Sequence, residues 1–246
     1  MSPHLTAPDH PVSEGITHTE PDSTITHTQR KGPVPTDKPR WIASGLMDVA
    51  FNAARVGHAE KARKTGGVPY LGHVMAVSAL VIEHGGTETQ AAAALLHDLL
   101  EDTTITYEHL AAYAGQEVAD IVRACSDTEN KPHPDRRTAD EKLADWMVRK
   151  ETYLARLADS QSDSPHLLVT LADKVHNGEQ TAREIHSVRT AGGNIASFWG
   201  MFNAPRDRQY WWYSSLLNVL AAKNWAPESQ PLIHRLDHAV KAITTA

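Results

Sequence analysis

One stretch of the chain decides both the expected fold and the expected chemistry: Leu95-Leu96-His97-Asp98-Leu99-Leu100-Glu101-Asp102-Thr103. It ends a segment of alanines and leucines with the composition of a buried helix. On a helix, residues four apart share a face, as His97 does with Glu101 and Asp98 with Asp102. Carboxylates are rarely buried unless they are paired or hold a cation. The stretch therefore indicates a divalent-metal site with a carboxylate pair beside it, and a solvated helix end is the alternative.

The rest of the chain divides into a tail and a helical region. Residues 1–39 hold half of the 14 prolines and almost no apolar periodicity, which is typical of a disordered N-terminal tail. From residue 41 onward apolar residues recur at helical spacing, and no alternating strand pattern of useful length appears. Thr87 with Gln90, and Thr138 with Glu141, have the spacing of capping boxes that begin helices. We expect an all-α bundle of about eight to ten helices, with a domain at 40–190 and a helical extension at 191–246 packed on it.

The composition narrows the class of protein. A formal net charge of −6 argues against nonspecific nucleic-acid binding, which needs a basic surface. The single cysteine, Cys125, excludes an intrachain disulfide framework and fits a reducing cytoplasm. No apolar run reaches the roughly 18 residues that a membrane helix needs. We therefore expect a cytoplasmic protein with no membrane contact.

Two further residues are candidates to complete a metal site. Asp173 interrupts a run of apolar helical residues, and a cation is the simplest partner for a carboxylate in that position. His73 begins another apolar helix, where a lone histidine is more often a surface or capping residue than a ligand. Together with His97 and Asp98 they would form a mixed nitrogen and oxygen site, which suits Mn²⁺, Fe²⁺ or Zn²⁺.

The order His73, His97-Asp98, Asp173 resembles the H…HD…D signature of HD-domain metal-dependent phosphohydrolases. Over roughly residues 45–185 the chain resembles more narrowly the hydrolase half of Rel/Spo-type alarmone enzymes, and in scale the stand-alone small alarmone hydrolases. Three stretches carry this resemblance. They are Arg63-Lys64-Thr65-Gly66-Gly67-Val68-Pro69-Tyr70, Ala93-Ala94-Leu95-Leu96-His97-Asp98-Leu99-Leu100-Glu101-Asp102-Thr103 and Val169-Thr170-Leu171-Ala172-Asp173-Lys174-Val175-His176-Asn177.

This resemblance implies an activity: removal of pyrophosphate from the 3′ position of (p)ppGpp to give GDP or GTP. It also implies a role for each matching residue. One Mn²⁺, or another divalent ion, would be held by His73, His97, Asp98 and Asp173. The attacking water would be oriented and deprotonated by Glu101 and Asp102. The purine would stack on Arg63, the ribose or a phosphate would meet Lys64, and the nucleoside pocket would be lined by Tyr70 and Asn177.

A basic loop provides a separate indication of an anionic ligand. Lys131, Arg136 and Arg137 could bind the distal phosphates, and a solvated loop is the equal alternative. The chain departs from the family at Val74, where proline is usual, and at Gly178, where a bulky apolar residue is usual and whose absence is expected to loosen the pocket floor.

These departures leave more than one substrate class open. One alternative is a phosphatase for other 3′- or 2′-phosphorylated nucleotides, such as ppApp, NADPH or a pyrophosphorylated tRNA end. Another is an antitoxin-like regulatory protein, with a cognate alarmone synthetase as partner. The sequence does not predict the oligomeric state.

Overall fold

The computed structural model describes residues 38–64, 66–128 and 137–245. Within these ranges, one isolated antiparallel bridge, between Ala62 and Pro69, accompanies eleven helices. They are α1 (Gly45–Gly57), α2 (Leu71–Glu83), α3 (Glu88–Leu96), α4 (Leu99–Asp102), α5 (Tyr107–Ala114), α6 (Gln116–Cys125), α7 (Ala139–Asp159), α8 (His166–Thr190), α9 (Ile195–Trp199), α10 (Arg206–Ala221) and α11 (Gln230–Thr244). Apart from α4, a single turn of four residues, ten described helices remain. The expected all-α bundle is confirmed.

Local signals determine where several helices begin and end. Both predicted capping boxes are present: the Thr87 and Thr138 hydroxyls accept from the backbone N–H of Gln90 and Glu141, whose side chains return the bond. Helix α2 ends just before Gly85, which has φ of 92°, a conformation that glycine adopts without the strain of a Cβ.

The helix expected to run through the opening stretch is interrupted. Helix α3 ends at Leu96, His97 and Asp98 form a turn, and α4 restarts at Leu99. The N–H of Asp102 donates to Asp98 O at 3.0 Å, so α4 is anchored on the turn itself. The expectation of one continuous helix was therefore wrong. The interruption places His97 and Asp98 at a corner of the backbone instead of on a regular helical surface.

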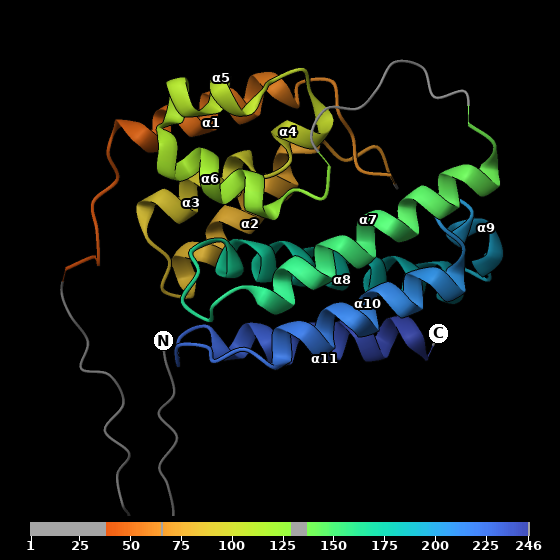
Figure 1. Ribbon diagram of the computed structural model, residues 1–246. Helices are drawn as coiled ribbons and strands as arrows, with labels where there is room; N and C mark the ends of the chain where they lie inside the picture. The colour runs from red at the N-terminus through yellow and green to blue at the C-terminus, as the bar shows by residue number, and fades with distance from the viewer. Residues whose placement is uncertain (1–37, 65, 129–136, 246) are drawn as a thin grey trace, which may run out of the picture. The chain divides into compact units, whose positions relative to one another are not determined.

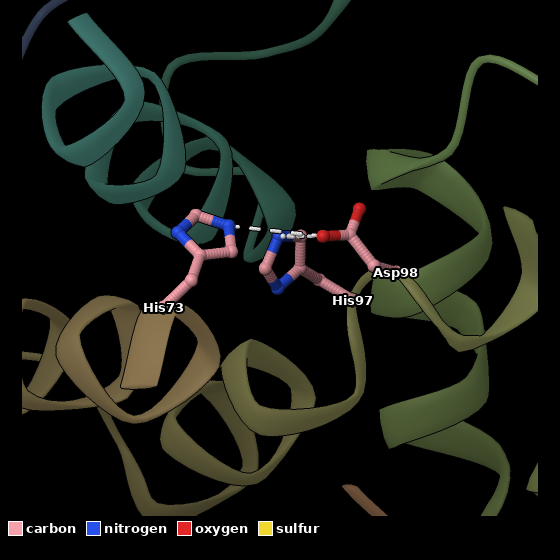
Figure 2. A group of neighbouring side chains, drawn as sticks. All are labelled: His73, His97 and Asp98. Atoms are coloured by element: carbon pink, nitrogen blue, oxygen red, sulfur yellow. Dashed lines mark ion pairs between the residues drawn. The ribbon is translucent and has the colours of Figure 1, made fainter. Parts of the chain in front are cut away.

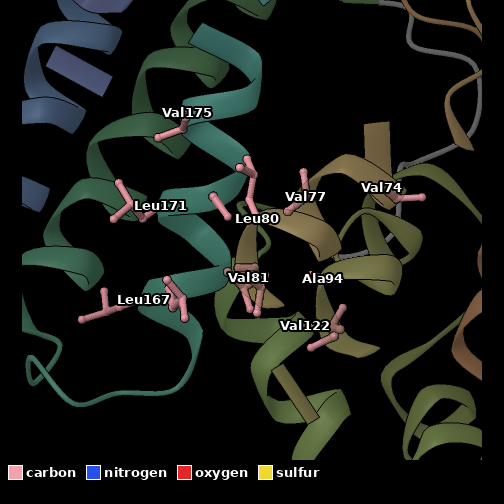
Figure 3. Close-up of a cluster of buried hydrophobic side chains, with 14 of the residues drawn as sticks. Val74, Val77, Leu80, Val81, Ala94, Val122, Leu167, Leu171 and Val175 are labelled. Carbon is pink, nitrogen blue, oxygen red and sulfur yellow. The ribbon is translucent and has the colours of Figure 1, made fainter. Parts of the chain in front are cut away.

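The core that holds this corner is built from α2, α3, α6 and α8. Figure 3 shows apolar side chains from these helices meeting, among them Val77 and Val81 of α2, Val122 of α6 and Leu171 of α8, all without solvent exposure. Burying each such side chain stabilises the fold by about 1.5–3 kcal/mol. Because α2, α3 and α8 share this core, residues at 73, 97 and 173 are brought to one place.

The C-terminal helices pack against α8. Figure 1 shows α11 along α8, and α10 beside α7 and α11, on the side away from α1 and α5. The approach is close at Gly178, where a Cβ would lie 3.2 Å from Ala239 Cβ of α11 and 3.7 Å from the Tyr213 ring. Gly178 therefore allows close packing of α8 on α11, a role that the expected loosening of a pocket floor did not foresee.

The predicted tail, residues 1–39, lies almost wholly outside the described residues. Residues from Arg40 onward form one compact unit. Among the described helices, none combines the length and apolar composition that crossing a bilayer requires.

Candidate metal centre

Four side chains that are distant along the sequence converge at the centre of the bundle. His73 comes from the first turn of α2, His97 and Asp98 from the corner between α3 and α4, and Asp173 from the N-terminal third of α8. His73, His97 and Asp173 are only 2–5% exposed. Figure 2 shows the His73 and His97 rings facing the Asp98 carboxylate.

The distances between these groups are those of a compact donor set. His97 Nε2 lies 3.0 Å from Asp98 Oδ2 and 3.5 Å from Asp173 Oδ1, and His73 Nε2 lies 3.7 Å and 3.2 Å from the same two oxygens. His73, His97 and Asp98 each offer one ligand atom within 4.8 Å of the others. The position of Asp173 was the strictest condition on the sequence-based proposal, and this aspartate lies within reach of both imidazoles.

Each imidazole directs Nε2 toward the carboxylates. The Ala94 carbonyl accepts from His97 Nδ1 at 2.8 Å, so the lone pair of the neutral ring lies on Nε2. His73 Nδ1 lies 2.9 Å from Nδ1 of His176, so Nε2 of His73 is free in the same way when His176 accepts. Both Nε2 atoms are buried and make no hydrogen bond of good geometry within the described part of the chain. Buried donors of this kind, beside two carboxylates, fit a divalent cation.

The charges of the four groups also suit a cation. Burial lowers the pKa of His97, but the Asp98 and Asp173 carboxylates outweigh it and hold this pKa well above the usual value, so a bound cation would replace the His97 proton. Burial raises the pKa of Asp98, but the facing His97 outweighs it and holds the pKa well below the usual range. Burial also raises the pKa of Asp173. Lys174 and the two imidazoles outweigh this effect, so the pKa of Asp173 lies well below its usual range. Burial lowers the pKa of His73, and the Asp173 carboxylate offsets this only in part. The site therefore carries two ionised carboxylates at neutral pH.

A chain of hydrogen bonds leads from Asp173 to the predicted substrate loop. Lys174 Nζ donates to Asp173 Oδ2 at 2.7 Å, and Asn177 Nδ2 donates to Oδ1 at 2.6 Å. Asn177 Oδ1 in turn accepts from both terminal nitrogens of Arg63 at 3.0 Å. Arg63 and Asn177, expected to line one pocket, are thus bonded to each other.

Tyr70 and Asp102 have partners that the sequence did not indicate. The Tyr70 hydroxyl donates to Asp98 Oδ2, and burial followed by the Asp98 charge raises the tyrosine pKa, so the phenol stays protonated. Lys61 Nζ forms an ion pair with Asp102 and lies 3.5 Å from the centroid of the Tyr70 ring. Tyr70, expected to line the nucleoside pocket, thus contacts a candidate metal ligand directly.

Glu101, on α4 beside the corner, is a candidate to exchange a proton. Its Oε1 accepts from the backbone N–H of Asp127 at 2.9 Å. Burial, together with the carboxylates of Asp127 and Asp98, raises its pKa to about 7. A carboxyl group with this pKa can act as a general base near neutral pH.

The remaining predicted substrate residues are spread more widely. Lys64 Nζ lies 3.4 Å from Asn203 Oδ1 and 5.3 Å from the centroid of the Phe202 ring, both just after α9. Arg137 pairs with Asp145 of α7 at 3.1 Å, with both side chains 41% exposed. Lys131 and Arg136 lie outside the described residues.

Comparison with known proteins identifies the family. A family model described as an HD domain matches residues 50–202, more than half of the chain. The chain belongs to the HD-domain family. The resemblance found in the H…HD…D motif is therefore confirmed.

Some related proteins are named as guanosine-3′,5′-bis(diphosphate) 3′-pyrophosphohydrolases, and others as GTP diphosphokinases. The MESH1 protein of Xenopus tropicalis, named a guanosine-3′,5′-bis(diphosphate) 3′-pyrophosphohydrolase, is 31% identical over 137 residues, 54% of this chain and 68% of that protein. A Synechocystis protein, named a probable enzyme of the same activity, is 33% identical over 132 residues. The chain spans 16% of that protein, and 18% of a rice protein named probable GTP diphosphokinase RSH3.

A solved structure confirms the fold. The metazoan ortholog of SpoT described as hydrolyzing ppGpp superposes with a TM-score of 0.59 at 22% identity, covering 82% of this chain and 97% of that one.

Several residues around the HD site were missed in the sequence, among them His176, His58, Phe202 and Asn203. His176 lies in the quoted Ala-Asp-Lys-Val-His-Asn run, and His58 precedes the Arg-Lys loop, so a search for buried histidines could have found both. His58 is 2% exposed and packs 5.1 Å from the Tyr70 ring, and burial lowers its pKa to about 4. Phe202 and Asn203 carry no local signal, because only the packing of the C-terminal helices brings them to Lys64.

Proposed function

We propose that this chain is a divalent-metal-dependent hydrolase that removes the 3′-pyrophosphate from guanosine tetra- or pentaphosphate, giving GDP or GTP and pyrophosphate. The convergence of His73, His97, Asp98 and Asp173 carries the proposal, with Glu101 and Asp102 on the adjoining turn. Membership of the HD family and the names of its relatives support it.

The four converging side chains would hold the cation, and we assign it as Mn²⁺. A divalent ion there supplies Lewis-acid polarisation of a phosphoryl oxygen and lowers the pKa of water. The mixed imidazole and carboxylate donor set favours Mn²⁺, Fe²⁺ or Zn²⁺ over metals that prefer sulfur ligands. Tyr70 would orient Asp98, and Asn177 with Lys174 would orient Asp173, through the bonds described above.

Glu101 and Asp102 would deprotonate and orient the attacking water. Glu101 takes a proton from water as the oxygen adds to the phosphorus bonded to O3′; the P–O3′ bond breaks, and O3′ becomes the hydroxyl of GDP or GTP. A pKa near 7 lets Glu101 accept and return that proton. Asp102, held by Lys61, would orient the same water.

The nucleotide would lie along the Arg63-Lys64 loop. Arg63, braced by Asn177, would stack on the purine, and Lys64 would meet ribose or phosphate beside Phe202 and Asn203. We assign the distal phosphates to the basic loop that includes Lys131, Arg136 and Arg137, by charge complementarity.

The wider context of the reaction is also part of the proposal. We assign the hydrolase domain to residues 40–190 and treat 191–246 as an extension, supported by the HD match over 50–202 and by the packing of α11 on α8. A cytoplasmic location rests on the single free cysteine.

Product analysis tests the proposal. The purified chain is incubated with ppGpp and Mn²⁺, and products are identified by anion-exchange chromatography and ³¹P NMR, with Asp98→Ala as the control. We expect GDP and pyrophosphate in equal amounts from the natural sequence and none from the variant. Faster turnover of ppApp, NADPH or pyrophosphorylated tRNA than of ppGpp would overturn the substrate assignment, and absence of turnover on every substrate would overturn the enzyme assignment.

A further inference from the structure

Asp127 lies directly behind Glu101, in the segment that follows α6. Its backbone N–H donates to Glu101 Oε1 at 2.9 Å, and its own side chain is only 6% exposed. The carboxylate of Asp127 belongs to neither the proposed cation site nor the proposed substrate loop. A buried carboxylate needs hydrogen-bond donors or cations as partners, and these partners indicate its role.

Helix α7 supplies those partners. Arg149 Nη1 donates to Asp127 Oδ1 at 3.1 Å, and Lys150 Nζ forms an ion pair with Oδ2. The preceding residue is held as well, because Arg156 Nη2 donates to the Ser126 carbonyl at 2.7 Å. Lys150 is fixed in turn by the Trp212 ring of α10, whose centroid lies 4.4 Å from Nζ. The backbone N–H that meets Glu101 is therefore clamped by three cations of one helix.

A buried ionic cluster of this kind is not needed merely to hold two segments of the chain together. Desolvating the charges of a buried ion pair can cost more than their attraction returns, and apolar residues of similar volume often stabilise a fold equally well. A buried ionic cluster that ends on a hydrogen bond to a reactive carboxylate is better explained by what it does to that carboxylate.

The cluster also determines the electrostatic surroundings of Glu101. Among the residues that the structure describes, the charged groups that act on Glu101 include Asp98 from the α3–α4 corner, Asp127, Lys150 of α7 and Lys174 of α8. Two are negative and two positive, so removing either member of the Asp127–Lys150 pair changes the balance in a known direction.

We propose that Asp127 is a positioning residue for Glu101: its N–H orients the glutamate, and its carboxylate, clamped by Arg149 and Lys150, holds a negative charge beside it. The catalytic part of this inference rests on the proposed function, because it takes Glu101 as the base. The positioning part does not, because orientation and proton affinity can be measured without substrate.

The test follows the titration of Glu101 directly. Side-chain carboxyl ¹³C signals are recorded against pH in the full chain without added metal, and Glu101→Gln identifies the Glu101 signal. In Asp127→Asn the N–H remains but the negative charge is lost, so the Glu101 pKa should fall by about one unit. In Lys150→Met the positive charge is lost, so the pKa should rise by about one unit.

Asp145→Asn is the matched control. Asp145 is the outer, 41% exposed partner of the same Arg149, so its loss should leave the Glu101 titration unchanged. A merely structural role for the cluster would give no opposite displacements in the two inner variants. An unchanged Glu101 pKa in Asp127→Asn, or a change in the same direction in both variants, would overturn the proposal. If Lys150→Met does not fold, the Glu101 pKa in Asp127→Asn alone decides it.

Activity gives the second measurement. Both inner variants, Asp127→Asn and Lys150→Met, are assayed with ppGpp as substrate. The acid limb of their kcat/KM profiles against pH should move in the same direction as the Glu101 pKa measured by NMR, and kcat should fall while KM changes little. If the natural sequence shows no hydrolysis, the proposed function fails, and the NMR titrations still decide whether Asp127 positions Glu101.

Discussion

Replacing Asp173 by alanine should separate the two roles of this buried carboxylate. Asp173 is 5% exposed and is both a candidate metal ligand and the partner of Lys174, whose ammonium is 2.7 Å away with a side chain only 17% exposed. Removing one partner of a buried pair costs about 3–5 kcal/mol. In a domain of this size each kcal/mol lowers the melting temperature by about 2–4 °C, so we expect a loss of about 6–20 °C.

The double variant Asp173→Ala with Lys174→Met removes both charges and should recover most of that loss. It should not recover metal binding. For the natural sequence, Mn²⁺ at a hundredfold excess over its Kd should add about 2.7 kcal/mol, or about 5–11 °C.

Melting curves by circular dichroism, with EDTA and with Mn²⁺, measure both effects. A double variant that melts like the natural chain in EDTA and still gains stability from Mn²⁺ would refute the assignment of Asp173 as a ligand. A single variant as stable as the natural chain would refute the buried-pair reasoning.

Three further outcomes are expected. Glu101→Gln should keep Mn²⁺ affinity, measured by calorimetry, but lower kcat by about 10²–10⁴-fold; loss of metal binding would show that Glu101 is a ligand. Because the Glu101 pKa is raised to about 7 and the base form exists above it, kcat/KM should increase about tenfold from pH 6 to pH 8, and a flat profile would contradict this. Gly178→Leu should lower the melting temperature by about 2–12 °C through overpacking against Ala239, whereas Gly45→Ala, with no atom within 4 Å of the added Cβ, should not.

Features set by neighbouring residues could be predicted from the sequence. The capping boxes of α3 and α7 depend on side chains three residues apart, and both are present. The convergence of His73, His97, Asp98 and Asp173 was predicted from the resemblance of their order to the H…HD…D signature. The apolar helical context indicated a cation only for Asp173, and for His73 it favoured a surface or capping residue.

Features set by distant packing could not be predicted in this way. The interruption of the helix at His97 goes against the helical propensity of its own segment, and the tertiary surroundings of the corner decide it. The bond between Arg63 and Asn177 joins residues 114 positions apart, and Lys64 meets Asn203 across 139. Asp127 donates a hydrogen bond to Glu101 from its backbone N–H, and a sequence motif of side chains cannot predict a bond of that kind.

The central claim is that one divalent ion is bound by four side chains from α2, α8 and the corner between α3 and α4. The most direct measurement is anomalous X-ray diffraction from crystals of the protein grown with Mn²⁺, collected on both sides of the manganese absorption edge. We predict a single strong peak in contact with His73, His97, Asp98 and Asp173. A peak elsewhere, or no peak at Mn²⁺ concentrations that support hydrolysis, would contradict the account.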